Sequence, residues 1–347
     1  MSGKKAWGPR PVVLPLLRKT VELKKEIRKA SIFISGLGHF QLSVNGQPIG
    51  DHFLAGGWTN YSKQALYVTF DITGQLKKGQ NVLGVLLGNG FYYIPSQRYR
   101  KMTGGWGYPK LMAKALVEYT DGSNEVIVSD ESWKTSPSPI IFSSMFGGED
   151  YDANREQNGW DQPGFNDKDW RNVVMTTGPA LLMAEMQEPV KIIKQFIADT
   201  LTELKPGVQV YDLLQNFSGL PSITVRGNKG DTIRLYAAEL TNADGTANQK
   251  ATGSPSWFTY ILKGEGEESW HPIFTYTGLR YIEAHCIPKD SGGIRPVLIQ
   301  VEGLHISNAA RANGIFSCSN ELFNKTHQLI DWAIRSNMVS VFTDCPH

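Results

Sequence analysis

Residues 40–46 constrain the fold of this chain more than any other stretch. Apolar and polar side chains alternate strictly from Phe40 to Val44, and Asn45-Gly46 follows directly. Strict alternation gives a β-strand one apolar face, and an Asn-Gly pair supplies the two positive φ angles that a two-residue hairpin turn needs. The stretch therefore predicts a β-hairpin with one buried face.

The same pattern recurs along most of the chain. Further strands are predicted at residues 66–72, 81–87, 111–119 and 125–128. A mixed segment at 181–195 predicts a linker, after which strands are predicted at 222–226, 232–237, 258–262 and 280–284. Short strands with glycine-containing turns between them are typical of sandwiches and jelly rolls. We therefore predict a mainly β chain with two β-sandwich (jelly-roll-like) domains, the first reaching about residue 185 and the second ending near 307.

The last thirty residues change to the helical period. Ser319 or Asn320 can cap a helix whose first turn holds Glu321. One face then carries Leu322, Phe323, Thr326, Leu329, Ile330, Ala333, Ile334 and Met338. A single helix cannot bury such a stripe by itself. We therefore predict that residues 316–341 either mediate self-association or dock on the chain's own sandwiches.

Composition and charge narrow the function classes. The chain holds 35 lysine and arginine residues against 33 aspartate and glutamate residues, a net charge of +2. This balance gives no electrostatic reason to expect nucleic acid as a partner. No apolar run approaches the roughly eighteen residues that a membrane span needs, and the first thirty residues show no signal peptide. The three cysteines lack metal-ligand spacing, so no metal-ligating residues are predicted.

A series of motifs resembles bacterial α-L-rhamnosidases, glycoside hydrolase family 78, in the same order along the chain. In the first module these are residues 39–46, 57–61, 67–72, 87–92, 148–154, Gly159-Trp160, Phe165, Asp167 and Trp170. In the second they are residues 211–219, 238–240 and 274–281. Residues 316–320 and the strip Thr343-Asp344-Cys345-Pro346 resemble the first helix and the active-site strip of the family's (α/α)6 barrel.

Two positions depart from the family pattern. Leu213-Leu214 stand where the family usually has Phe-Gly, which raises a question of subfamily. His347 stands where the family's strip continues into an arginine and an acidic residue.

The resemblance implies a domain plan and an activity. It implies an N-terminal β-sandwich at 1–185, a concanavalin-like β-sandwich at 186–307 and the start of a truncated all-α barrel at 308–347. The family hydrolyses terminal α-L-rhamnosyl linkages in plant glycans or glycosides without a redox or metal cofactor, and it suggests a periplasmic or secreted location. Glycoside hydrolysis needs two carboxyl groups. In the family both follow the position of His347, so we expect no catalytic residue in this chain and no activity from it alone.

Asp344 is the position that matches a family active-site residue. The resemblance implies that its carboxylate hydrogen-bonds sugar hydroxyls, whereas the alternative is a loop carboxylate that caps backbone N–H groups. Two other functions stay open at this point. Lyases that cut between rhamnose and glucuronate share the scaffold, and a stand-alone carbohydrate-binding β protein would need no barrel.

The aromatic segment from residue 90 to 108, with Asn89 directly before it, is the candidate carbohydrate-binding region of the first sandwich. Aromatic faces stack on the apolar side of sugar rings, and amide or guanidinium groups bind hydroxyls. The candidates are Asn89, Phe91, Tyr92, Arg98, Trp106 and Tyr108. Packing of the sandwich is the alternative for these aromatics. A calcium ion on this module could use Asp51, Asn60 or Asn89.

Overall fold

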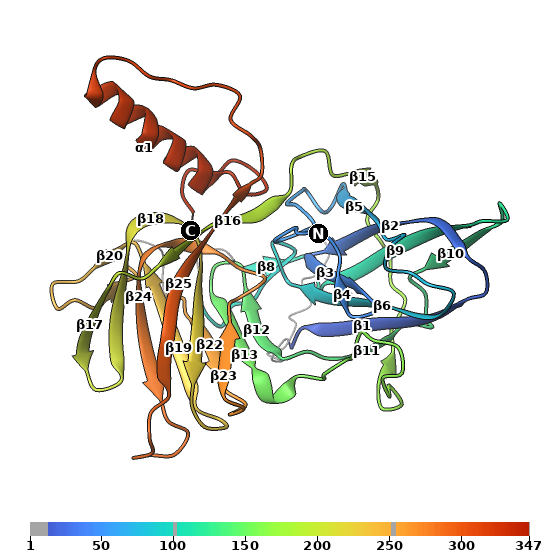
Figure 1. The fold of residues 1–347 in the computed structure, drawn as a ribbon, viewed down its shortest axis with the longest axis horizontal. Coiled ribbons are helices and arrows are strands. Elements are labelled where there is room, and N and C mark those ends of the chain that lie inside the picture. The colour runs from blue at the N-terminus through green and yellow to red at the C-terminus, as the bar shows by residue number, and fades with distance from the viewer. Residues whose placement is uncertain (1–12, 100–102, 251–254, 347) are drawn as a thin grey trace, which may run out of the picture.

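The computed structural model describes residues 13–99, 103–250 and 255–346. Two β units lie side by side, and a single α-helix projects from one of them (Figure 1). The predicted fold class, mainly β with sandwich units followed by the beginning of a helical region, is confirmed.

The first unit is a sandwich of two β-sheets whose strands are mainly antiparallel. One sheet has the order β14 (Arg171–Asn172), β11 (Lys134–Pro137), β1 (Pro15–Leu23), β6 (Gly79–Gly88), β3 (His39–Val44) and β4 (Gln47–Pro48). The other has the order β10 (Asn124–Val128), β9 (Lys110–Tyr119), β2 (Ile27–Leu37), β5 (Ala65–Asp71) and β15 (Leu182–Ala184). Buried side chains of both sheets, Ile34, Leu42 and Val85 among them, pack together in the core with Trp133, which directly precedes β11.

The predicted hairpin opens this sandwich as expected. Asn45 and Gly46 have φ angles of 54° and 80°, and Val44 pairs with Gln47 across the turn. Because β3 alternates, Leu42 and Val44 enter the core while Gln41 and Ser43 face outward. These outward positions form one wall of a groove described below.

The second unit is a curled ten-stranded sheet. Its main path is β12 (Ile140–Ser144), β13 (Gly148–Asp152), β22 (Phe258–Ile261), β19 (Thr232–Ala238), β24 (Thr277–Ile287), β18 (Val208–Arg226), β25 (Val297–Asn308) and β16 (Val190–Ile197). Strands β17 (Thr200–Lys205) and β23 (Glu267–Trp270) also pair with β18. The long β18 pairs with β24 along its first part and with β25 along its second, so the sheet turns over on itself and encloses Phe217, Ile223 and Leu279.

Strands β12 and β13 lie in this second sheet although the sequence predicts them as part of the first domain. Asp150 of β13 pairs in parallel with Thr259 of β22. A small cluster of Leu14, Ile140 and Phe274 seals the same seam. The division of the chain at residue 185 stays a prediction, and the hydrogen bonding ties the two units together across it.

The remaining elements are short. They are the pairs β20 (Leu240–Thr241) with β21 (Ala247–Asn248) and β7 (Tyr93–Ile94) with β8 (Gly104–Gly105), and the 3₁₀ turn η1 (Ala153–Arg155).

Helix α1 (Glu321–Asn337) begins at the predicted cap, because the Asn320 side chain accepts a hydrogen bond from Leu322 N–H. Its apolar stripe is largely uncovered: Leu322, Leu329 and Ile334 are 69%, 61% and 44% exposed. Only the end of the helix meets the second unit, where Trp332 contacts the rings of Phe196 and His305. Docking on the chain's own sandwiches is therefore confined to this end, and self-association stays a prediction. None of the described helices is long and apolar enough to cross a membrane.

Candidate functional site

The strip that carries Asp344 returns from α1 to the junction between the two β units. Val339, only 4% exposed, packs in a cluster with Tyr61 of the first unit and Leu304 of the second. Ser340 Oγ accepts a hydrogen bond of 2.7 Å from the backbone N–H of Trp58. The strip is thus held by both β units just before it reaches Asp344.

The Asp344 carboxylate is exposed at this junction. The Cys345 thiol lies 3.7 Å from its Oδ1, and no backbone N–H of the described residues donates to the carboxylate. This geometry favours an Asp344 carboxylate that is available to accept hydrogen bonds over one that caps backbone N–H groups. His347, the second position where the sequence departs from the family, lies outside the described residues.

Two tyrosines lie beside this strip: Tyr99, which the sequence places in the aromatic segment, and Tyr276, which was not predicted as a site residue. Tyr99 and Tyr276 both interact electrostatically with Cys345. Burial raises the pKa of Tyr276 to about 12, with the neighbouring thiol as a second cause. Both phenols are therefore neutral hydrogen-bonding groups at physiological pH. Tyr276 belongs to the motif at 274–281, which was the available signal.

Arg98 is buried at the seam between the units. Its guanidinium pairs with Asp150 and lies 3.8 Å from the ring centre of Trp257 and 4.1 Å from that of Phe142. Burial lowers the pKa of Arg98, and the Asp150 carboxylate opposes that shift. The guanidinium is thus enclosed by the protein's own groups, which supports a framework role.

Asn89, Phe91 and Tyr92 are buried too. Asn89 Nδ2 donates a 2.7 Å hydrogen bond to the Ser143 carbonyl, and the Phe91 ring stacks on Trp58 with centres 4.4 Å apart. Tyr92 is 4% exposed. Such positions stabilise the sandwich by removing apolar surface from water, and they leave little open face for a sugar.

Trp106 and Tyr108 are the exposed members of the six candidates, at 49% and 37%. Trp106 stacks on Tyr92 with centres 6.2 Å apart, and Tyr108 lies against Tyr93. The structure thus separates the six residues into four buried and two exposed ones. A carbohydrate role for the exposed pair stays a prediction.

The three residues predicted as possible calcium ligands each have other neighbours in the structure. Asp51 pairs with Lys191 at 2.5 Å, Asn60 Oδ1 accepts from Ser62 at 2.6 Å, and Asn89 lies in the buried seam. Across residues 13–99, 103–250 and 255–346, no group of three or more histidine, cysteine, aspartate or glutamate side chains is arranged to hold a metal ion.

Comparison with known families gives three matches in chain order. Residues 25–194 match the α-L-rhamnosidase N-terminal domain, residues 202–307 the bacterial α-L-rhamnosidase concanavalin-like domain, and residues 311–347 the bacterial α-L-rhamnosidase 6 hairpin glycosidase domain.

Individual α-L-rhamnosidases are similar over nearly the whole chain. The structure of the enzyme from Dictyoglumus thermophilum is 41% identical with a TM-score of 0.86, over 96% of this chain and 37% of that one. The Streptomyces avermitilis α-L-rhamnosidase, solved with L-rhamnose, is 35% identical with a TM-score of 0.87, over 99% of this chain and 34% of that one.

A curated α-L-rhamnosidase of Formosa agariphila is 33% identical over 346 residues, which is 95% of this chain and 35% of that protein. The chain thus spans about a third of the length of the curated relatives it matches. With three family domains matched in order and the fold shared with solved members, the chain belongs to the α-L-rhamnosidase family.

Proposed function

We propose that the full-length protein hydrolyses terminal α-L-rhamnosyl linkages in plant glycans or glycosides. In this proposal the present chain is its non-catalytic N-terminal portion. The observation that carries the proposal is the anchored strip, because the exposed Asp344 carboxylate lies in the segment that matches the glycosidase domain.

Asp344 acts in this proposal as a substrate-binding residue. Its carboxylate has two acceptor oxygens that can bind two neighbouring sugar hydroxyls. A general acid that protonates the leaving oxygen and a second carboxylate must come from elsewhere in the full-length protein. The bonds from Trp58 to Ser340 and from Asn308 N–H to the Met338 carbonyl would limit movement of the strip, so that Asp344 is positioned before substrate arrives.

The proposed chemistry needs no cofactor. To bind a calcium ion on the first sandwich, Asp51 and Asn60 would have to give up contacts with Lys191 and Ser62, whereas Asn89 is buried. The carbohydrate partner we propose is a rhamnose-containing glycan.

The test is turnover of 4-nitrophenyl α-L-rhamnoside by the full-length protein and its Asp344→Asn variant. We expect kcat/KM to fall by about tenfold to a hundredfold, because a charge-assisted hydrogen bond to substrate is lost. Asp169→Asn, at an exposed carboxylate of the first unit, is the matched control.

Three outcomes would count against parts of this proposal. If the full-length protein does not turn over the rhamnoside, the proposed activity is wrong. If Asp344→Asn and the control have the same kcat/KM, the proposed substrate-binding role of Asp344 is wrong. Turnover by the 347-residue chain alone would show that the catalytic carboxyl groups lie within it.

A further inference from the structure

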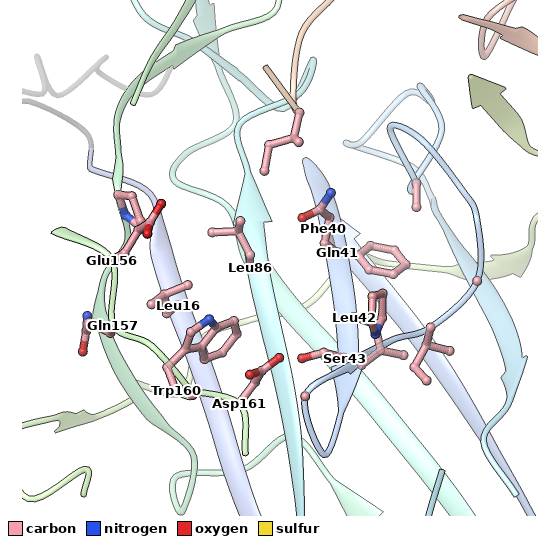
Figure 2. Close-up of a pocket in the computed structure, with 18 of the residues that line it drawn as sticks. Leu16, Phe40, Gln41, Leu42, Ser43, Leu86, Glu156, Gln157, Trp160 and Asp161 are labelled. Carbon is pink, nitrogen blue, oxygen red and sulfur yellow. The ribbon is translucent and has the colours of Figure 1, made fainter. Parts of the chain in front are cut away.

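A groove of about 540 Å³ runs over the outer face of the six-stranded sheet. Figure 2 shows Glu156, Gln157 and Trp160 on one side of it, and Gln41 and Ser43 on the other, with the apolar Leu16 and Leu86 on strands β1 and β6. Its lining includes neither the strip at 338–346 nor any of the six residues nominated from the sequence. Its volume suits a small ligand or part of a larger one.

Gly84 explains why the loop at 156–161 can lie so close to the sheet. A Cβ at Gly84 would come within 2.5 Å of Ser43 Oγ, 2.6 Å of Asp161 Cβ and 3.1 Å of the Trp160 ring. Any larger residue in the middle of β6 would push Trp160 and Asp161 away from β3. Glycine inside a strand often marks such a close approach.

The loop is held rigidly in place. Gln157 Nε2 donates to Ser136 Oγ at 3.0 Å and to the Pro137 carbonyl at 3.1 Å, while its Oε1 accepts from Trp170 Nε1 at 3.0 Å. The Trp160 ring stacks on Trp170 with centres 6.2 Å apart. A ligand would therefore meet a preformed wall and would not have to order it.

Two polar side chains of the groove are uncommitted. Among the described residues, neither the Gln41 amide nor the Asp161 carboxylate has a hydrogen-bond or ion-pair partner, and both border the space beside Trp160. Ser43 Oγ makes only a long bond of 3.4 Å to the Gly84 carbonyl. An amide, a carboxylate and a hydroxyl beside an indole ring supply both kinds of contact that a sugar offers.

The charge of the groove selects against anionic ligands. Its lining contains no lysine or arginine; Glu156 is paired with Lys263 at 2.9 Å, whereas Asp161 has no ion-pair partner among the described residues and leaves the groove negative. Burial lowers the pKa of the lining His52, so this imidazole is neutral at pH 7. Phosphorylated ligands and uronates would be repelled, whereas neutral sugars would not.

We propose that this groove is a non-catalytic binding site for neutral saccharides, with Trp160 stacking on the sugar ring and Gln41 and Asp161 binding its hydroxyls. The site is independent of the proposed hydrolysis. Binding is measured without turnover, so either proposal can fail while the other holds.

The test uses the 347-residue chain labelled with 5-fluorotryptophan and titrated with L-rhamnose, D-galactose, D-glucose and D-xylose to about 50 mM, which covers millimolar dissociation constants. The ¹⁹F resonance of Trp160 is assigned as the one missing in Trp160→Phe. We expect at least one of the sugars to shift this resonance saturably. No saturable shift with any of the four would overturn the proposal.

Variants locate the binding site. We expect Trp160→Ala to weaken binding by about tenfold, and Gln41→Ala, at an exposed side chain without a hydrogen-bond partner among the described residues, by about threefold. Trp106→Ala removes an exposed indole outside the groove and tests the aromatic segment as the competing sugar-binding site. If Trp106→Ala loses binding while Gln41→Ala and Trp160→Ala retain it, the sugar binds at the aromatic segment. That result would overturn the proposal that the groove is the binding site.

Discussion

Two segments of the first unit carry aromatic residues, and they differ in how far these residues are exposed. The segment 90–108 has the higher aromatic density, yet three of its six aromatic rings, those of Phe91, Tyr92 and Tyr99, are buried, as is Arg98. The loop 156–161 has one aromatic residue, Trp160, which is partly exposed and lines the groove. Aromatic density along a sequence therefore does not identify a sugar-binding surface. Partners from distant segments decide which rings are covered.

The buried segment is covered by residues far away in sequence. Asp150 and Trp257 enclose Arg98, and the Ser143 carbonyl accepts from Asn89. The groove, in contrast, is lined by side chains whose hydrogen-bonding groups are partly unused. The comparison predicts that substitutions in the first segment change stability and that substitutions in the groove change binding.

The largest expected effect is that of Arg98→Ala. We expect the free energy of unfolding to fall by about 3–5 kcal/mol, because Asp150 would be left as an unpaired carboxylate at a buried seam. Arg226→Ala, which breaks an exposed pair with Glu267, should cost about 0–1 kcal/mol. Urea unfolding of both variants measures the difference. If Arg98→Ala is as stable as the unchanged chain but has lost sugar binding, Arg98 is a binding residue and the contrast between the two segments is wrong.

Glu149, next to Asp150, should make the stability depend on pH. Burial raises its pKa to about 8 from an ordinary 4.5. Between these values the folded chain keeps a proton that the unfolded chain releases, so this contribution to stability is lost as pH rises through 8. The slope is at most about 1.4 kcal/mol per pH unit, or about 2 kcal/mol from pH 6.5 to 8.

The measurement is the free energy of unfolding against pH for the unchanged chain and for Glu149→Gln. His39, whose pKa burial lowers to about 4, gives the opposite dependence, but only below about pH 6.5. Above that pH we expect the decline to disappear in Glu149→Gln and to persist in the exposed control Glu188→Gln. Parallel curves for Glu149→Gln and the unchanged chain would show that this carboxyl group is not protonated in the fold.

Local pattern was enough to predict much of the fold. The alternating runs at 66–72 and 111–119 became β5 and β9 within one or two residues, and Asn45-Gly46 formed its turn. Strands β1 and β2 were not predicted, because their exposed faces and the turn between them read as one charged stretch from 18 to 29. The pairing of β13 with β22 joins Asp150 to Thr259, and no local signal specifies such a partner.

The sequence alone could predict only part of the groove. Gly159-Trp160 was recognised as a family motif, and Gln41 lies on the polar face of the first alternating run. Neither feature alone indicates a site, because the two residues meet only when the loop folds back over the sheet. Gly84, inside an otherwise apolar strand, was the signal that another segment approaches there.

The smallest expected effect concerns Leu214, where the chain departs from the family's usual glycine. Leu214 has a φ of 61° and is 57% exposed, so its side chain contributes little packing while its backbone adopts the left-handed region. That conformation costs a non-glycine residue about 1–2 kcal/mol, whereas glycine adds about 0.5–1 kcal/mol of entropy loss on folding. Leu214→Gly should therefore raise the free energy of unfolding by about 0.5–1 kcal/mol, as measured by urea unfolding.

Leu240→Gly is the control for Leu214→Gly, since Leu240 is similarly exposed at 61% but is not among the residues with positive φ. It should lower stability, because glycine there only adds flexibility to the unfolded chain. Destabilisation by both substitutions would mean that the Leu214 side chain contributes more than its strained backbone costs. In that case an exposed side chain would contribute to the stability of the fold, and exposure alone would no longer separate framework positions from binding positions.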